Sequence, residues 1–247
     1  MPESASPFRL KGNYFAEPYH FRTDVTTGVC RTPTGVRICT LPPDFLLGLR
    51  DALIYECGKS YRTVLKAAGR RWGSQWIKRL DREWTAYYQQ PFRELPAGLI
   101  RVCLADAFAA HGYGKLDYTR AEESPEFWSA EIGDSLFPAL VGESDRPVDL
   151  LMSGLLAAIF SYLHGLTMDC LQTECPSMGA ERSRFLIGPA PRIAELEAWW
   201  EANTPLPSHE QVLQQAAATP HAPTNGQTHT HQEHHLPHSQ PPLEVVS

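Results

Sequence analysis

Apolar residues recur every three to four positions through the first half of the chain, which is the spacing of a helix with one buried face. Asp44 is a candidate N-cap for a helix over 44–57, in which Phe45, Leu49 and Leu53 share that face. The same spacing predicts three further helices, over 61–68, 75–88 and 96–111.

Glycine and serine residues mark the expected ends of these helices. Gly69 ends the second helix, Ser74 is the N-cap of the third, and the Gly112-Tyr-Gly114 turn follows the fourth. The first half of the chain is therefore expected to hold separate helices of ordinary length.

The second half of the chain changes from a helical period to an alternating one. Strands are expected over 115–119, 126–132, 166–173 and 184–188, in addition to an earlier strand over 35–41. Between the two later pairs, Pro147 begins a long apolar helix that ends at His164, before Gly165. A short amphipathic helix with Trp199 and Trp200 follows. Several helices, and then a helix inside a run of strands, predict an α+β fold rather than a doubly wound one.

Composition divides the chain near residue 203. The stretch 1–202 is expected to form a single domain with an N-terminal extension, whereas 203–247 is rich in His, Pro and Gln. Such a segment buries too little apolar surface to offset the entropy lost on ordering, so a disordered tail is predicted. Its histidines could chelate Ni, Cu or Zn weakly, although a solvated low-complexity tail is the preferred interpretation. The histidines in question are His229, His231, His234 and His235.

Charge and hydropathy exclude several classes of protein. The net charge of −6 and the lack of a Lys/Arg block argue against nucleic-acid binding. No secretion signal is visible, and the best apolar segment, 150–163, is too short to span a membrane. The cysteines are therefore expected to be reduced thiols in a cytoplasmic protein. Neither a Gly-x-Gly-x-x-Gly nor a Walker motif is present, so the usual cofactor cradles are not expected.

The candidate reactive groups centre on Cys170, Glu174 and Cys175. A structural zinc site needs four N or S donors, whereas this segment offers two thiols and one carboxylate. Positions 170 and 175 would face opposite sides of a strand, so ordinary half-buried thiols are preferred and no metal is expected. His164 could act as a base, but a histidine at a helix C-terminus more often complements the helix dipole. No catalytic residue is assigned.

The segment from Gln172 to Phe185 resembles the C-terminal motif of the 4-vinyl-reductase-type domain family, and the resemblance extends over roughly residues 10 to 200. In the ligand-sensing members of that family, the positions of Gln172, Cys175 and Ser183 contribute to a zinc site. Two of those three ligand types are replaced here, so the metal is not carried over. The resemblance implies a TRAPP-like fold, in which helices pack on an antiparallel sheet, enclose an apolar cavity and form dimers through the early helices.

Shorter motifs resemble, more narrowly, cyanobacterial members of the family that are linked to photosystem II assembly. These motifs are Lys11-Gly-Asn-Tyr-Phe15, Trp72-Gly73, Gly112-Tyr-Gly-Lys-Leu116 and Gln172-Thr-Glu-Cys175. The narrower resemblance implies photosystem II assembly intermediates as partners, and a homodimer or a heterodimer with a related domain. It also implies a location at the periphery of the thylakoid membrane.

The aromatic content suits either a packed core or a cavity for a flat hydrophobic ligand, such as a tetrapyrrole. The expected pocket residues are Leu151, Leu155, Ala158, Phe160, Tyr162, Trp76 and Trp84. We predict a non-catalytic accessory factor that holds such a ligand and assists photosystem II assembly. The alternatives are a component of a tetrapyrrole vinyl reductase, with a partner supplying electrons, and a TRAPP-like structural scaffold whose core is filled by side chains.

Overall fold

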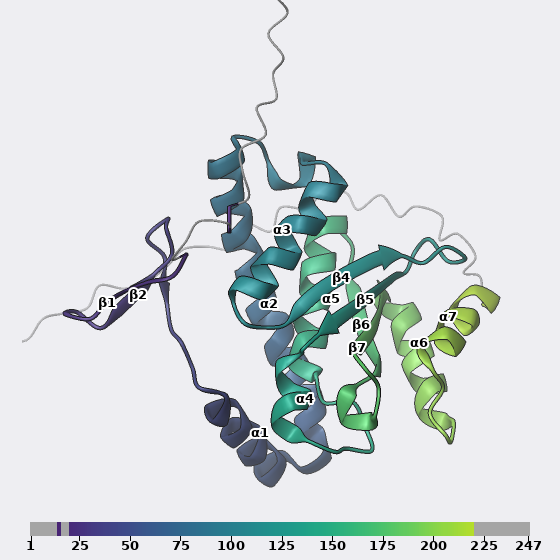
Figure 1. Cartoon of the computed structure of the whole chain (residues 1–247). Coiled ribbons are helices and arrows are strands. Elements are labelled where there is room, and N and C mark those ends of the chain that lie inside the picture. The colour runs from purple at the N-terminus through teal and green to yellow at the C-terminus, as the bar shows by residue number, and fades with distance from the viewer. Residues whose placement is uncertain (1–13, 16–19, 220–247) are drawn as a thin grey trace, which may run out of the picture.

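The computed structural model describes residues 14–15 and 20–219, and Figure 1 shows how their helices and strands are arranged. The helices are α1 (Pro43–Cys57), α2 (Tyr61–Tyr88), α3 (Ala97–Ala110), α4 (Leu136–Val141), α5 (Leu150–His164), α6 (Ala190–Ala202) and α7 (His209–Ala218). The strands are β1 (Arg22–Asp24), β2 (Val29–Arg31), β3 (Arg37–Ile38), β4 (Lys115–Arg120), β5 (Trp128–Gly133), β6 (Met168–Glu174) and β7 (Ser183–Pro189).

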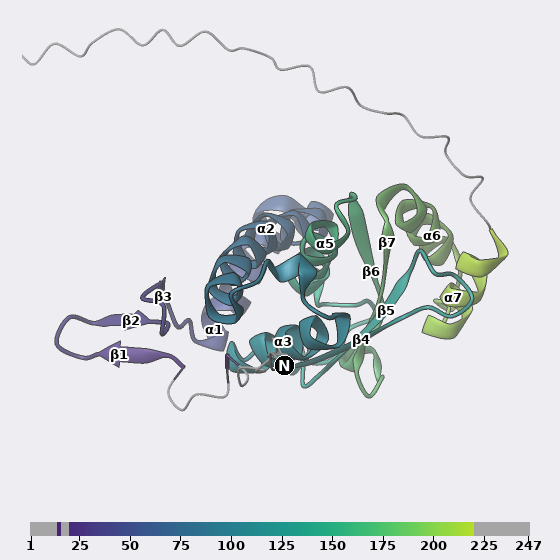
Figure 2. The same ribbon diagram turned by 90° about the horizontal axis from the view of Figure 1, so that it is seen from above.

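A four-stranded antiparallel sheet with the strand order β4-β5-β7-β6 forms the centre of the molecule. Helices α3 and α5 cover one face of this sheet, with α2 packed against α5, and helices α6 and α7 cover the other face (Figure 2). Strands β1, β2 and β3 form a separate small antiparallel sheet before α1. The predicted α+β class, with helices packed on an antiparallel sheet, is confirmed.

Alternating side chains of the strands build an apolar layer on each face of the sheet. Leu116, Ala130 and Phe185 belong to the core under α3 and α5, whereas Leu171 and Leu186 belong to the core under α6 and α7. All five side chains are buried. Burial of apolar surface on both faces therefore holds the two helical layers to one sheet.

Helix α2 is continuous, so the predicted helix end at Gly69 and N-cap at Ser74 are wrong. A Cβ atom added to Gly69 would lie 2.1 Å from the Leu151 carbonyl oxygen of α5. On α5, a Cβ added to Gly154 would lie 2.0 Å from the Lys66 carbonyl oxygen. The glycines therefore allow two helix backbones to approach closely, and this packing outweighs their helix-propensity cost of about 1 kcal/mol each.

The predicted start of the disordered tail at residue 203 is also wrong, because α7 lies beyond it and packs on the sheet. A capping box formed by Ser208 and Gln211 begins this helix. Val212 and Ala216 are buried against α6 and the sheet. The helix is short and its apolar face is narrow, so composition alone did not reveal it. The histidines of the predicted tail lie outside the described residues.

Helix α1 is the most exposed of the described helices, and none of its side chains is buried. It lies at the edge of the molecule, where it contacts α2 and α4 (Figure 1). The predicted apolar stripe is present, but Phe45 is 51% exposed and Leu49 is 47% exposed. Across the described ranges, no helix combines the length and apolar character needed to cross a membrane.

Candidate functional site

A cavity of about 420 Å³ lies where the start of α3 and the end of α5 meet β4 and β5. Its volume falls within the range typical of small-molecule sites. We call it the aromatic pocket, after the large side chains that form its apolar part. These side chains are Ile100, Tyr118, Trp128, Phe160 and Leu163.

Strand alternation and small helical residues together explain why the pocket forms at this place. Tyr118 pairs with Ala130 across the β4–β5 ladder, and Trp128 lies two residues before Ala130, so both aromatic residues face the helices. On α3, the opposite wall includes Gly98, where an added Cβ atom would meet no other atom within 4 Å. A small residue opposite large rings leaves the space open.

Aromatic rings from three elements form the floor of the pocket. The Phe160 centroid lies 5.2 Å from that of Tyr118 and 5.6 Å from that of Trp128. The His164 centroid lies 5.3 Å from that of Trp128. Tyr118 and Phe160 are buried, Trp128 is half-buried and His164 is exposed, so the cluster extends from the core to the mouth. A half-buried indole can stack on a flat ligand.

Burial keeps the polar ring groups of the pocket uncharged near neutral pH. Desolvation raises the pKa of Tyr118 to about 12, so its hydroxyl group remains a hydrogen-bond donor. Burial, and then the nearby Arg120 charge, lower the pKa of His164, which favours its neutral ring. The pocket can therefore orient a polar group of a ligand without a charged residue in its interior.

Arginine side chains surround the mouth of the pocket. They come from the short helical turn Phe92–Glu94, from α3 and from β4, and they are Arg93, Arg101 and Arg120. The site thus has an apolar interior and a cationic rim.

The predicted pocket residues fall in different places. Phe160 lines the aromatic pocket, whereas Ala158 and Tyr162 line a second cavity of about 420 Å³ between α2 and the end of α5. Leu151 and Leu155 contact the glycines of α2. A ligand site on the α5 face that contacts α2 stays a prediction.

The predicted tryptophans belong to the packed core. Trp76 is 2% exposed and its ring centroid lies 5.7 Å from that of Phe108. Trp84 is fully buried, with its ring centroid 4.8 Å from that of Phe92. Sequence reasoning did not select Trp128 as a pocket residue, although its place two residues before Ala130 on a predicted strand would have put it on the helix-facing side.

The segment that resembles a zinc-binding motif contains a buried hydrogen-bonded cluster. Gln172 Nε2 donates to Asp149 Oδ2 and to Ser183 Oγ, each at 3.3 Å. Ser183 also donates to Asp149, and Ser135 Oγ donates to Asp149 Oδ1 at 2.9 Å. Structural zinc prefers thiolate and imidazole donors, whereas this cluster offers an amide, hydroxyls and one carboxylate. Burial raises the pKa of that carboxyl to about 6. These residues therefore do not fit the zinc that the family resemblance implies.

The weaker metal candidates do not converge either. Cys170 is buried in the core under α5, and burial raises the pKa of its thiol. Glu174 turns toward α7, where Oε1 accepts the His209 backbone N–H at 3.1 Å and Oε2 lies 3.6 Å from Arg184. Cys175 is fully buried. Within the described part of the chain, no three His, Cys, Asp or Glu side chains are grouped to hold a metal.

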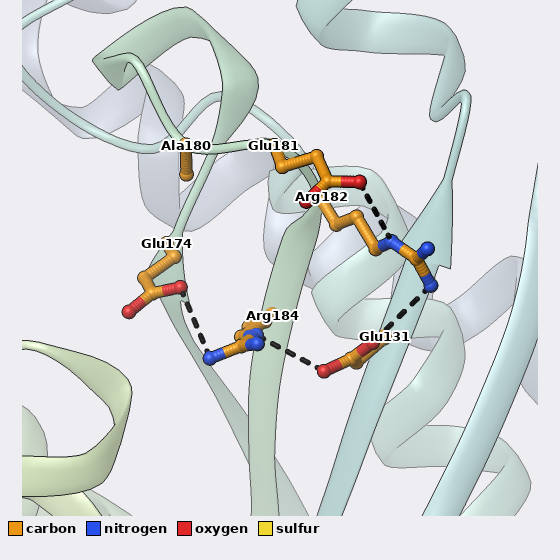
Figure 3. Close-up of a pocket in the computed structure, with 6 residues that line it drawn as sticks. All are labelled: Glu131, Glu174, Ala180, Glu181, Arg182 and Arg184. Carbon is orange, nitrogen blue, oxygen red and sulfur yellow. Dashed lines mark ion pairs between the residues drawn. The ribbon is translucent and has the colours of Figure 1, made fainter.

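A polar depression of about 510 Å³ lies on the α7 side of the sheet (Figure 3). Arg184 lies between Glu131 and Glu174, at 3.0 and 3.6 Å, and Arg182 lies 3.6 Å from Glu131. These charges neutralise one another, and exposed ion pairs of this kind contribute at most about 1 kcal/mol each. The aromatic pocket is therefore the better candidate for a ligand site.

Residues 128–189 match the family model of the vinyl-4-reductase domain. This segment runs from β5 to β7, and it contributes Trp128, Phe160 and His164 to the aromatic pocket. No protein of curated function matches the chain.

Solved structures show the same fold at low sequence identity. The phenol-responsive sensory domain of the transcription activator PoxR, solved with phenol, aligns with a TM-score of 0.57 and 18% identity, covering 72% of this chain and 90% of that chain. A vinyl-4-reductase family protein from Methanocaldococcus jannaschii aligns with a TM-score of 0.42 and 14% identity, covering 61% and 82%. A trafficking protein particle complex subunit 3 from Naegleria fowleri, covalently bound to palmitic acid, aligns with a TM-score of 0.43 and 14% identity, covering 59% and 93%. The fold is of the vinyl-4-reductase and TRAPP-like class.

Proposed function

We propose that this protein binds a small hydrophobic molecule with a flat ring in the aromatic pocket, and acts as a binding factor rather than an enzyme. The observation that carries the proposal is an open cavity of about 420 Å³ against the Trp128 and Phe160 rings. A flat apolar ligand would bury its surface there and stack on the half-buried indole.

Two further observations support a binding function. The PoxR sensory domain, solved with phenol, shares the fold over most of its length. In addition, the Tyr118 hydroxyl group and the His164 ring lie on the walls of the pocket, where they can hydrogen-bond a polar substituent of the ligand.

A narrower form of the proposal is that the ligand is a tetrapyrrole and that the protein assists photosystem II assembly at the thylakoid periphery. It rests on the short cyanobacterial motifs, two of which lie together in space, since the Trp72 and Tyr113 rings meet edge to face at 5.2 Å. A complete tetrapyrrole is larger than the cavity, so part of it would lie outside the pocket. The absorption spectrum of the protein purified from its native host tests this form.

We also propose that α1 forms the contact with a second copy or with a related domain. Leu41, Phe45 and Leu49 are spaced by four residues and are all close to half exposed, at 51%, 51% and 47%. Such a stripe gains free energy when a partner removes it from water. The same stripe favours the alternative of a TRAPP-like scaffold, which differs from the binding factor in needing no ligand.

The Gly98→Trp variant tests the main proposal, because the new indole would enter the aromatic pocket without meeting a nearby atom. We expect the wild-type protein to bind the neutral fluorophore N-phenyl-1-naphthylamine, and the variant to bind it about tenfold more weakly or less, which is 1.4 kcal/mol. Fluorescence titration measures both affinities.

Gly48→Trp on α1 is the matched control, since a Cβ atom added to Gly48 also meets nothing within 4 Å. The control should bind the probe as the wild type does. Equal affinity in Gly98→Trp and Gly48→Trp would show that the probe does not enter the aromatic pocket, and the proposal would then fail.

A further inference from the structure

We propose that the aromatic pocket selects hydrophobic ligands that carry an anionic group, such as a ring-bearing carboxylate, over neutral ligands of the same shape. This inference rests on the proposed function, and it names the chemical class of the ligand for the same site.

The lining of the pocket is apolar inside and cationic at the mouth. Arg93, Arg101 and Arg120 come from separate elements and converge there, and the lining residues in the described chain include no Asp or Glu. The chain as a whole has a net charge of −6, so the mouth has the opposite sign to the rest of the protein. A cleft lined by charges of one sign on apolar walls concentrates ligands of the other sign.

Two of these arginines retain the capacity to bind an anion. Arg101 is already paired with Asp117, at 2.5 Å. By contrast, neither Arg93 nor Arg120 forms an ion pair with another described residue. Arg120 uses its Nε to donate to the Pro125 carbonyl oxygen, which leaves its terminal N–H groups for a planar, two-point contact with a carboxylate.

The positions of the rings and the arginines allow one ligand to contact both. The Arg120 guanidinium carbon lies 5.8 Å from the centroid of the Trp128 ring, which forms the outer part of the pocket floor. The Arg93 guanidinium carbon lies 4.3 Å from the Tyr162 ring centroid, at the side of the same mouth. A ligand ring stacked on Trp128 would therefore place an acidic substituent on its edge beside Arg120.

A matched pair of fluorescent probes tests the selectivity. The probe 8-anilino-1-naphthalenesulfonate differs from N-phenyl-1-naphthylamine only by its sulfonate group, so the ratio of their affinities isolates the effect of the charge. We expect the wild-type protein to prefer the anionic probe by about tenfold, the scale of a hydrogen bond to a charged group. The preference should fall as the salt concentration rises, because the mouth is exposed.

The double variant Arg93→Gln/Arg120→Gln should lose this preference and keep its affinity for the neutral probe. Arg37→Gln/Arg71→Gln removes the same charge from exposed positions outside the pocket, and it should bind both probes as the wild type does. Gly98→Trp should weaken binding of both probes, which assigns the anionic probe to this site rather than to another surface.

The outcomes separate the two proposals. If the neutral probe binds the pocket but the wild type shows no preference, or if the preference persists in Arg93→Gln/Arg120→Gln, the anion selectivity is wrong and the proposed binding function stands. If neither probe is displaced by Gly98→Trp, both proposals are wrong.

Discussion

Helix α5 meets its neighbours in two opposite ways. Along its length it lies against α2 so closely that a Cβ atom on Gly69 or Gly154 would overlap a carbonyl oxygen of the facing helix. At its C-terminal end, Phe160 and His164 face the start of α3 across an open cavity, and a Cβ atom added to Gly98 on the far wall would meet nothing within 4 Å. Small helical residues are present in both places.

The difference lies in what approaches each small residue. Between α2 and α5, the two backbones move into the space left by the missing side chains, and close packing is restored. At the start of α3, the large rings of Tyr118 and Trp128 hold the helix away from the sheet, so the space remains. A glycine in a helix therefore indicates room, but the partner decides whether that room is filled.

Gly154→Ala should have the largest effect on the closed side. Its new methyl group would lie 2.0 Å from the Lys66 carbonyl oxygen and 2.6 Å from the Arg70 backbone nitrogen, and neither is a flexible side-chain end. We expect a loss of more than about 3 kcal/mol in the free energy of unfolding. Urea denaturation measures it, and Gly48→Ala, at an open helical position, should instead gain up to about 1 kcal/mol. A small loss for Gly154→Ala would show that α2 and α5 do not pack as described.

Asp149 should give the closed side a pH dependence of intermediate size. Burial raises its folded pKa to about 6, above the ordinary value of 3.8, so the native state binds more protons than the unfolded state between these values. The free energy of unfolding should therefore fall as the pH rises from about 4 to 6, by at most about 3 kcal/mol, and this contribution should change little above that range.

Asp149→Asn is the variant that isolates this effect, because the amide fills the same space next to Ser183 and Gln172 but does not titrate. Urea denaturation across this pH range should show a flatter profile for the variant than for the wild type. An unchanged profile would assign the pH dependence to other groups.

Ala158→Trp should have the smallest effect of the three on stability and sharpens the comparison most. Ala158 is 5% exposed and its Cβ atom lies 2.9 Å from the position of a Cβ on Gly73, but it also borders the second cavity. We expect overpacking to cost about 1–3 kcal/mol while binding of N-phenyl-1-naphthylamine persists in the protein that remains folded. Retained stability with lost binding would instead support the predicted ligand site on this face of α5.

Much of the fold could be predicted from local patterns. The helix ending at Ala110, the strands of the main sheet and the long helix before Gly165 follow from period and from turn residues. Helix α4 and the contacts of α7 could not, because a short helix with few apolar residues is stabilised mainly by what it packs against. Among the predicted pocket residues, Phe160 lies in the aromatic pocket, and the arginine rim was not predicted at all.

The sequence by itself determined which faces of the helices and strands are apolar, and therefore the α+β class and the replacement of two zinc-ligand types at Gln172 and Ser183. Only the tertiary structure decided what covers each face. It joined the segments around Gly69 into one helix, closed α5 against α2, and left a cavity beside Trp128. The physical reason is that periodicity reports the burial of a side chain, whereas a cavity depends on the shapes of residues far apart in the chain.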